Sequence, residues 1–85
     1  MVEKKVTINW RAGLHSRPAS ELVKVANRFK SKISIKHGDL EADAKSILSI
    51  ITLGVTYKAT LIILVEGEDE KEAIETIIEL FEKEI

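Results

Sequence analysis

The sequence predicts an α+β domain in which helices cover one face of a single antiparallel sheet. Several short segments alternate apolar and polar residues, as half-buried strands do. Two longer segments repeat apolar residues every three or four positions, as amphipathic helices do. The segments follow the order β-α-β-β-α-β-α. This order favours one antiparallel sheet, but it does not separate a ferredoxin-like fold from other split β-α-β arrangements.

The first element is a strand within residues 2–10. Apolar residues alternate there with polar ones, and only Lys4 interrupts the apolar face. The apolar members are Val2, Val6, Ile8 and Trp10. Residues 11–15 then form a loop, in which Gly13 is free to adopt a positive φ.

A helix is expected to begin at about Ser16. Ser16 is a suitable N-cap, and Pro18 is tolerated only in the first turn of a helix. The apolar face that follows has helical spacing and comprises Ala19, Leu22, Val23, Ala26 and Phe29. These signals place His15 at or just before the N-terminus of the helix.

The middle of the chain predicts a hairpin and a short helix. Residues 33–37 and 40–44 alternate around a Gly-Asp turn signal, which predicts a β-hairpin. Ser46 and Gly54 bracket the apolar stretch 47–53 as helix start and stop signals. Its apolar residues cover more than one face, so we expect one face to be buried and another to be exposed.

The last two elements are a strand and a helix. Residues 60–65 are a continuous apolar run, the pattern of a central strand. Asp69 and Glu72 have the spacing of a capping box, which predicts a helix from there to the C-terminus. Its apolar face comprises Ala73, Ile74, Ile77, Ile78 and Phe81.

The composition indicates one globular domain spanning residues 1–85, with 45% hydrophobic and 32% charged residues. The absence of cysteine excludes disulfides, thiolate metal sites and thiol nucleophiles. The first residues, with charged Glu3, Lys4 and Lys5 after Met1, do not have the pattern of a signal peptide, and no apolar run approaches the length of about 20 residues that a membrane helix needs. We therefore expect a cytoplasmic protein that does not bind membranes.

The net charge of −1 hides an asymmetry along the chain. Residues 1–37 carry nine Lys or Arg and two Glu, whereas residues 66–85 carry nine Asp or Glu and two Lys. The basic half favours acidic partners or nucleic acid, although an ordinary solvated surface would give the same pattern. Nucleic-acid binding is not expected, because the chain lacks an aromatic platform on a strand and a Gly-x-x-Gly clamp.

The most informative stretch is residues 13–19, which read Gly-Leu-His-Ser-Arg-Pro-Ala. A helix N-terminus offers unpaired N–H groups and a partial positive charge, and so binds anions. Arg17 adds a planar cation suited to phosphate. A neutral imidazole beside these groups can accept a phosphoryl group and hold it. On this chemistry alone, the simpler interpretation is favoured: His15 caps a helix and Arg17 is solvated.

The same seven residues resemble the active-site signature of the HPr family, the histidine phosphocarriers of the bacterial sugar phosphotransferase system. Residues 44–47 with 53–54 resemble the regulatory-serine region of that family, and residues 66–70 resemble the segment before its last helix. The resemblance spans essentially the whole chain without insertions. It implies an open-faced β-sandwich of four antiparallel strands in the order 1-4-2-3, with three helices on one face.

The resemblance also implies a function. His15 would take a phosphoryl group on Nδ1 from the phosphoenolpyruvate-dependent first enzyme and pass it to a sugar-specific IIA domain. Arg17 would pair with the phosphate, and the N–H groups of Ser16 and Arg17 would receive it. Such a protein is a carrier rather than a free-standing enzyme. It is expected to be a monomer without metal or cofactor.

Ser46 has a structural and a regulatory interpretation. As an N-cap it needs no further explanation. The resemblance implies that it is phosphorylated by the HPr kinase/phosphorylase, although enteric relatives carry a serine there without that use. Partners are expected to dock on the exposed apolar face of the second helix, with Ile47, Leu48 and Ile51 as the contact residues.

The alternative function is that of an HPr-like regulatory paralogue, which acts as a corepressor for a catabolite-control transcription factor through phospho-Ser46. Such paralogues typically lack the active-site histidine, so His15 argues against this as the sole role.

Five positions depart from the family pattern or are unusual. Ser16 stands where Ala or Thr is usual, but its backbone N–H is unchanged, so the site is expected to survive. Ser49 is expected to alter partner preference and Lys58 to alter its turn, whereas Trp10 and Arg11 have no functional account in the sequence.

Overall fold

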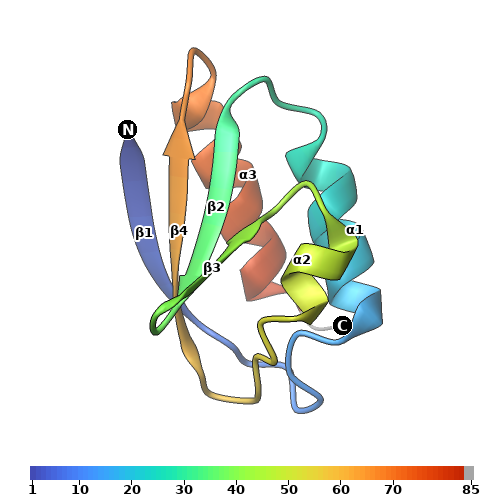
Figure 1. Ribbon diagram of the computed structural model, residues 1–85. Coiled ribbons are helices and arrows are strands. Elements are labelled where there is room, and N and C mark those ends of the chain that lie inside the picture. The colour runs from blue at the N-terminus through green and yellow to red at the C-terminus, as the bar shows by residue number, and fades with distance from the viewer. Residues whose placement is uncertain (84–85) are drawn as a thin grey trace.

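The computed structural model describes residues 1–83. Its four strands form one sheet, and Figure 1 shows the three helices on a single face of it. The strand order is β1-β4-β2-β3, and every neighbouring pair is antiparallel. This confirms the open-faced β-sandwich of the predicted α+β class. The elements are β1 (Val2–Thr7), α1 (Ser16–Ala26), β2 (Lys32–His37), β3 (Leu40–Asp43), α2 (Ile47–Ile51), β4 (Thr60–Glu66) and α3 (Glu70–Glu82).

The central position predicted for β4 is confirmed, because it lies between β1 and β2. Alternate side chains of β4 point towards the helices and are fully buried: Leu61, Ile63 and Val65. Ile62 and Leu64 point to the open face and are only half-buried. The continuous apolar run therefore serves both the covered and the open face of the sheet.

The first strand is shorter than predicted. β1 ends at Thr7, although Ile8 and Trp10 continue the inward-facing pattern and are buried. The Lys58 N–H donates to the Ile8 carbonyl at 2.8 Å, where the chain leaves the sheet for the loop before α1. β1 is also an edge strand, so Val2 and Val6 are only half-buried.

The hairpin and the second helix are confirmed with small differences in length. Gly38 has φ 61°, and His37 pairs with Leu40 across the two-residue turn. α2 ends at Ile51 with Thr52 as its C-cap, two residues earlier than the predicted stretch. Gly54 has φ 62°, as expected of a stop signal after a helix.

The helices bury the faces that their periods predict. α1 buries Ala19, Leu22 and Ala26 in the core, while Val23 and Phe29 are half-buried and packed against it. α3 buries Ala73, Ile77 and Phe81, and also Leu80, which the predicted face omitted. The predicted run of α3 to the C-terminus includes residues 84 and 85, which lie outside the described residues. No helix within residues 1–83 is long and apolar enough to cross a membrane.

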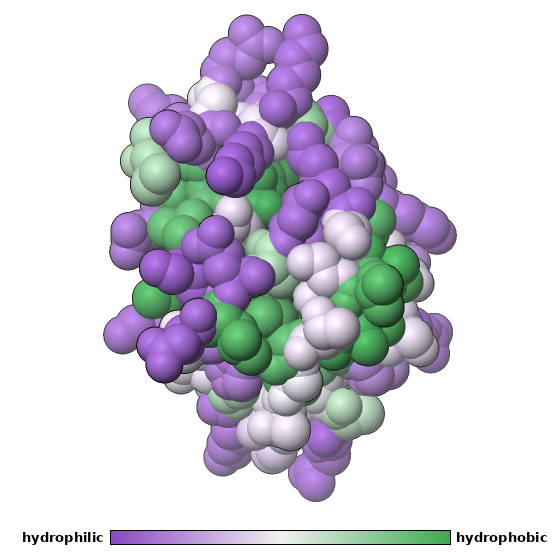
Figure 2. Space-filling view, viewed as in Figure 1, coloured by the Kyte–Doolittle hydropathy of each residue, from purple (hydrophilic) through white to green (hydrophobic). Residues whose placement is uncertain are grey.

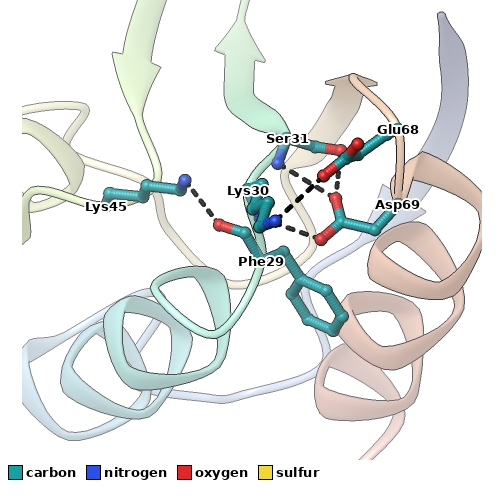
Figure 3. A network of polar contacts seen from close by, with 6 residues as sticks. All are labelled: Phe29, Lys30, Ser31, Lys45, Glu68 and Asp69. Atoms are coloured by element: carbon teal, nitrogen blue, oxygen red, sulfur yellow. Dashed lines mark hydrogen bonds and ion pairs between the residues drawn. The ribbon is translucent and has the colours of Figure 1, made fainter.

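The predicted capping box at the start of α3 is wrong. Asp69 is the N-cap, but its carboxylate makes no hydrogen bond within its own helix. It accepts instead from the N–H groups of Lys30 at 2.8 Å and Ser31 at 3.0 Å, and from the Ser31 hydroxyl (Figure 3). The N–H groups of Lys30 and Ser31 lie in the α1–β2 loop, where no strand or helix offers them an acceptor, so they donate to the Asp69 carboxylate instead. The side chain that folds back is Glu70, which accepts from the Gly67 N–H at 3.1 Å.

Candidate functional site

The loop between β1 and α1 carries His15, and its shape depends on Gly13. The Gly13 N–H donates to the Trp10 carbonyl at 2.8 Å, and the Leu14 N–H donates to the Val55 carbonyl at 3.0 Å. Gly13 has φ 74°, and a Cβ there would lie 2.3 Å from the Val55 oxygen. The two backbone segments approach so closely that only glycine fits between them.

Trp10 anchors the beginning of this loop. Its side chain is buried, and its ring stacks on Phe81 with centroids 5.4 Å apart. The indole Nε1–H donates to the Lys83 carbonyl at 2.7 Å, at the C-terminal end of α3. Trp10 therefore holds the loop before His15 against the last helix, which is the structural account that the sequence lacked.

His15, not Ser16, is the N-cap of α1, so the N-cap expectation for Ser16 is corrected. His15 is extended, with φ −83° and ψ −175°, and its carbonyl accepts from the Ala19 N–H at 3.0 Å. The bond between Leu14 and Val55 holds the chain extended up to His15, so helical dihedral angles begin one residue later. The prediction that the helix starts at about Ser16, with His15 just before it, is confirmed.

This geometry concentrates free donors beside the imidazole. The first N–H groups of a helix have no partner within the helix. Pro18 has no N–H, and Ala19 already donates to His15, so the N–H groups of Ser16 and Arg17 are the free ones. They lie at the positive end of the helix dipole, next to a half-buried imidazole and the exposed Arg17 side chain. Such a place suits a phosphate group.

The expected contact residues of α2 lie on the surface. Leu48 is 71% exposed, and Ile47 and Ile51 are just over 40% exposed. Ile50 faces the other way and is buried. α2 packs against α1, and Figure 2 shows a hydrophobic patch over α2. The predicted division into a buried and an exposed face is confirmed.

Ser46 caps α2, as predicted. Its backbone is extended, and its hydroxyl oxygen accepts from the Ser49 N–H at 3.3 Å. The Ser49 hydroxyl in turn accepts from the Asp43 N–H at 2.9 Å and ties α2 to the end of β3. Ser49 therefore has a structural task in this chain, and its expected effect on partner preference stays a prediction.

The Lys58 turn keeps a glycine-like backbone. Lys58 has φ 70° and is the one non-glycine residue with positive φ among residues 1–83. The expectation that lysine alters this turn relative to the family stays a prediction. Within the same residues, no group of three His, Cys, Asp or Glu side chains could hold a metal ion.

Comparisons with known proteins agree on one family. The family model for the PTS HPr component phosphorylation site matches residues 2–83. The HPr-like protein Crh of Halalkalibacterium halodurans is 42% identical over 99% of this chain and 100% of its own length. The phosphocarrier protein HPr of Buchnera aphidicola is 45% identical over 88% of each chain. The structure of HPr-C-His from Thermoanaerobacter tengcongensis covers both chains completely, with 35% identity and a TM-score of 0.91.

Some relatives are described as dimers. A structure of Crh from Bacillus subtilis has a TM-score of 0.79 and 34% identity over 100% of this chain and 98% of its own. It is described as a dimer with a swapping domain. The monomer expected for the present chain therefore stays a prediction. Family match, identity and fold agree over nearly the full length, so the chain belongs to the HPr family of phosphotransferase-system phosphocarriers.

Proposed function

We propose that His15 accepts a phosphoryl group from the phosphoenolpyruvate-dependent first enzyme and passes it to sugar-specific IIA domains. The observation that carries this proposal is the position of His15 as the N-cap of α1, beside the free N–H groups of Ser16 and Arg17. Both the imidazole and Arg17 can be reached from outside, as transfer between proteins requires.

The proposed transfer is a substitution at phosphorus. The Nδ1 lone pair of neutral His15 forms a bond to phosphorus while the bond to the donor breaks. The N–H groups of Ser16 and Arg17 and the Arg17 guanidinium then balance the charge of the phosphoryl oxygens. Attack by the acceptor breaks the phosphorus–nitrogen bond and returns the imidazole to its neutral state. The protein thus acts as a carrier between two enzymes.

The exposed apolar face of α2 is the proposed docking surface for both partners. Its residues, Ile47, Leu48 and Ile51, are exposed on α2, which packs against α1, so a partner that covers both helices would also reach His15 at the start of α1. Exposed apolar patches rimmed by polar residues commonly mark protein interfaces. Truncating the side chains of this docking surface should weaken the complex with the donor enzyme and the complex with the acceptor domain.

Ser46 is the proposed regulatory site, modified by an HPr kinase/phosphorylase. Its hydroxyl lies at the N-terminus of α2, immediately before the docking residues. A phosphate there brings about −1.5 to −2 charges at neutral pH. The charge would repel an acidic donor enzyme without disturbing the helix, because the N-terminal end of a helix favours negative charge.

A corepressor-type role is the second candidate function. The observation in its favour is the 42% identity to a Crh protein over nearly the whole chain. In this role phospho-Ser46 would bind a catabolite-control transcription factor. Regulatory paralogues of this kind typically lack the active-site histidine, so His15 supports the carrier as the main function.

Phosphorylation by the host's first enzyme tests the main proposal. The chain is incubated with that enzyme and phosphoenolpyruvate, and intact-mass spectrometry at neutral pH counts the phosphoryl groups. Wild type and His37→Ala should each gain one acid-labile group, whereas His15→Ala should gain none. His37 is the matched control, because it is the other histidine of the chain and lies in β2. A label retained in His15→Ala would show that the site is misassigned.

A further inference from the structure

A cluster of one aromatic ring and two cations lies near the His15 loop. The guanidinium carbon of Arg11 is 6.0 Å from the centroid of the Tyr57 ring, and Lys58 Nζ is 5.6 Å from it. All three side chains are exposed, and the Tyr57 side chain is 41% exposed. We call Arg11, Tyr57 and Lys58 the Tyr57 cluster. The proposed transfer chemistry uses none of them.

The backbone holds the Tyr57 cluster beside the active loop. Arg11 belongs to the loop that leads to His15, and Tyr57 lies two residues after Val55, which binds the Leu14 N–H. A Cβ on Gly13 would lie 3.0 Å from the Thr56 Cα, so these segments are in close contact. A partner that docks at His15 therefore meets this cluster at the edge of its footprint.

Lys58 occupies a backbone conformation that glycine would adopt more easily. Its φ is 70°, and its N–H donates to the Ile8 carbonyl at 2.8 Å. Left-handed dihedral angles are unfavourable for residues with a Cβ. Strained residues of this kind concentrate at functional sites, where the side chain is needed despite the strain. The strain is thus an independent indication that the lysine side chain has a task.

The charges of the cluster point to an anionic ligand. Two cations converge on one ring, and neither forms an ion pair with a carboxylate within residues 1–83. The ring face attracts each cation, whereas the cations repel each other. A carboxylate bound beside them would relieve that repulsion. Tyr and Arg are also the residue types that most often dominate binding energy at protein interfaces.

We propose that the Tyr57 cluster binds a surface carboxylate of the phosphorylated donor enzyme while that enzyme docks at His15. This proposal rests on the carrier function proposed above. The donor is the favoured partner because it arrives carrying the phosphoryl group, and so is more anionic than after transfer. The cluster thus adds a polar contact to the apolar docking surface on α2 and helps the donor to find the correct orientation.

Two variants test the proposal, with the donor enzyme and phosphoenolpyruvate as the assay. Lys58→Gly removes the cation and also relieves the strained backbone, while Arg11→Gln removes the other cation. Each should raise the KM for the chain by about three- to tenfold at low salt, as expected when a steering charge at an interface rim is lost. The difference should shrink in high salt. Lys71→Gln, an exposed cation on α3, is the matched control and should leave KM unchanged.

Stability separates this role from a purely structural one. Lys58→Gly should keep or raise the Tm while it raises KM, because the strain is removed together with the ligand-binding charge. An unchanged KM for both variants, with wild type still phosphorylated on His15, would overturn the proposal and leave the carrier function standing. Failure of the donor to phosphorylate wild type would contradict the carrier function itself and, with it, this proposal.

Discussion

Position 13 shows how a single residue controls the place of His15. Gly13 combines a positive φ with a close approach to Val55, whose oxygen would lie 2.3 Å from a Cβ. Gly38 also has a positive φ of 61°, but no atom lies within 4 Å of the place where its Cβ would be. A Cβ at Gly38 would therefore add backbone strain alone, whereas a Cβ at Gly13 would add backbone strain and a steric clash.

Gly13→Ala should destabilise the protein more than Gly38→Ala. Gly38→Ala is the control and should lose about 1 kcal/mol of unfolding free energy, because alanine is strained in the left-handed conformation. Gly13→Ala should lose about 3 kcal/mol, because the clash of its Cβ with the Val55 oxygen adds to that strain. Urea denaturation of both variants measures this. Phosphoryl transfer to His15 should slow only in Gly13→Ala, because the loop must shift. Equal losses of stability would show that the Val55 contact relaxes freely.

Sequence reasoning located His15 at a helix start but could not explain Trp10. A tryptophan between a strand and a loop does not reveal its partner, and Lys83 lies 73 positions away along the chain. The task of Asp69 was misjudged for the same reason. Its spacing to Glu72 indicates a local cap, whereas the actual donors come from a loop nearly 40 residues earlier. Local spacing predicts local contacts only.

At the scale of elements, α2 depends on its cap because it has only five residues. A helix this short is unstable by itself and needs tertiary packing and capping. The Ser46 hydroxyl supplies an acceptor for the Ser49 N–H, and Ile50 anchors the helix in the core. A substitution at Ser46 thus first affects the hydrogen bond that caps α2. If it also introduces charge, it affects the binding of partners as well.

Ser46→Asp and Ser46→Ala should therefore affect different properties: Ser46→Asp the kinetics with the donor enzyme, and Ser46→Ala the stability of the fold. Asp also caps helices, so Ser46→Asp should keep its Tm, whereas Ser46→Ala should lose about 1 kcal/mol of unfolding free energy. In the transfer assay, Ser46→Asp should raise the KM for the donor enzyme at low salt, and Ser46→Ala should not. Thermal melts and donor kinetics measure both. Unchanged donor kinetics for Ser46→Asp at low salt would reduce Ser46 to a helix cap.

The elements themselves were predictable because their hydrophobic periods are clear, but their ends and their order were not. The alternating residues 2–10 do not reveal that β1 stops at Thr7, where the chain turns out of the sheet. The period of residues 60–65 does not reveal that β4 separates β1 from β2. Strand order came from the family resemblance, since periodicity reports which side of an element is buried and not its neighbours.

At the scale of the whole molecule, the Asp69 contacts join loops at the opposite end of α1 from His15. Asp69 binds Lys30 and Ser31, and the Lys45 ammonium donates to the Phe29 carbonyl of the same loop at 2.8 Å (Figure 3). The segments before β2, α2 and α3 are thus held together there. The Ser31 hydroxyl and, after it, the Lys30 N–H hold the pKa of Asp69 below its ordinary value.

This lowered pKa predicts acid sensitivity. A carboxylate with a lowered folded-state pKa stabilises the fold above its unfolded pKa of about 4, and that contribution is lost as the pH falls through the folded-state value. The urea midpoint of wild type should therefore fall on acidification below about pH 4. Asp69→Asn should be less stable at neutral pH and less sensitive to acid. Glu70, whose pKa the Gly67 N–H lowers, should leave some sensitivity. Parallel curves for the two proteins would contradict the assignment.

The central claim is that this chain carries a phosphoryl group between two proteins, and a chase experiment tests it most directly. The chain is phosphorylated by the first enzyme, freed of enzyme and phosphoenolpyruvate, and mixed with a purified IIA domain at neutral pH. Mass spectrometry then follows both proteins. Our account predicts that the phosphoryl group leaves His15 and appears on the IIA domain. A phosphoryl group that stays on the chain, or leaves only as inorganic phosphate at the rate seen without the IIA domain, would contradict the account.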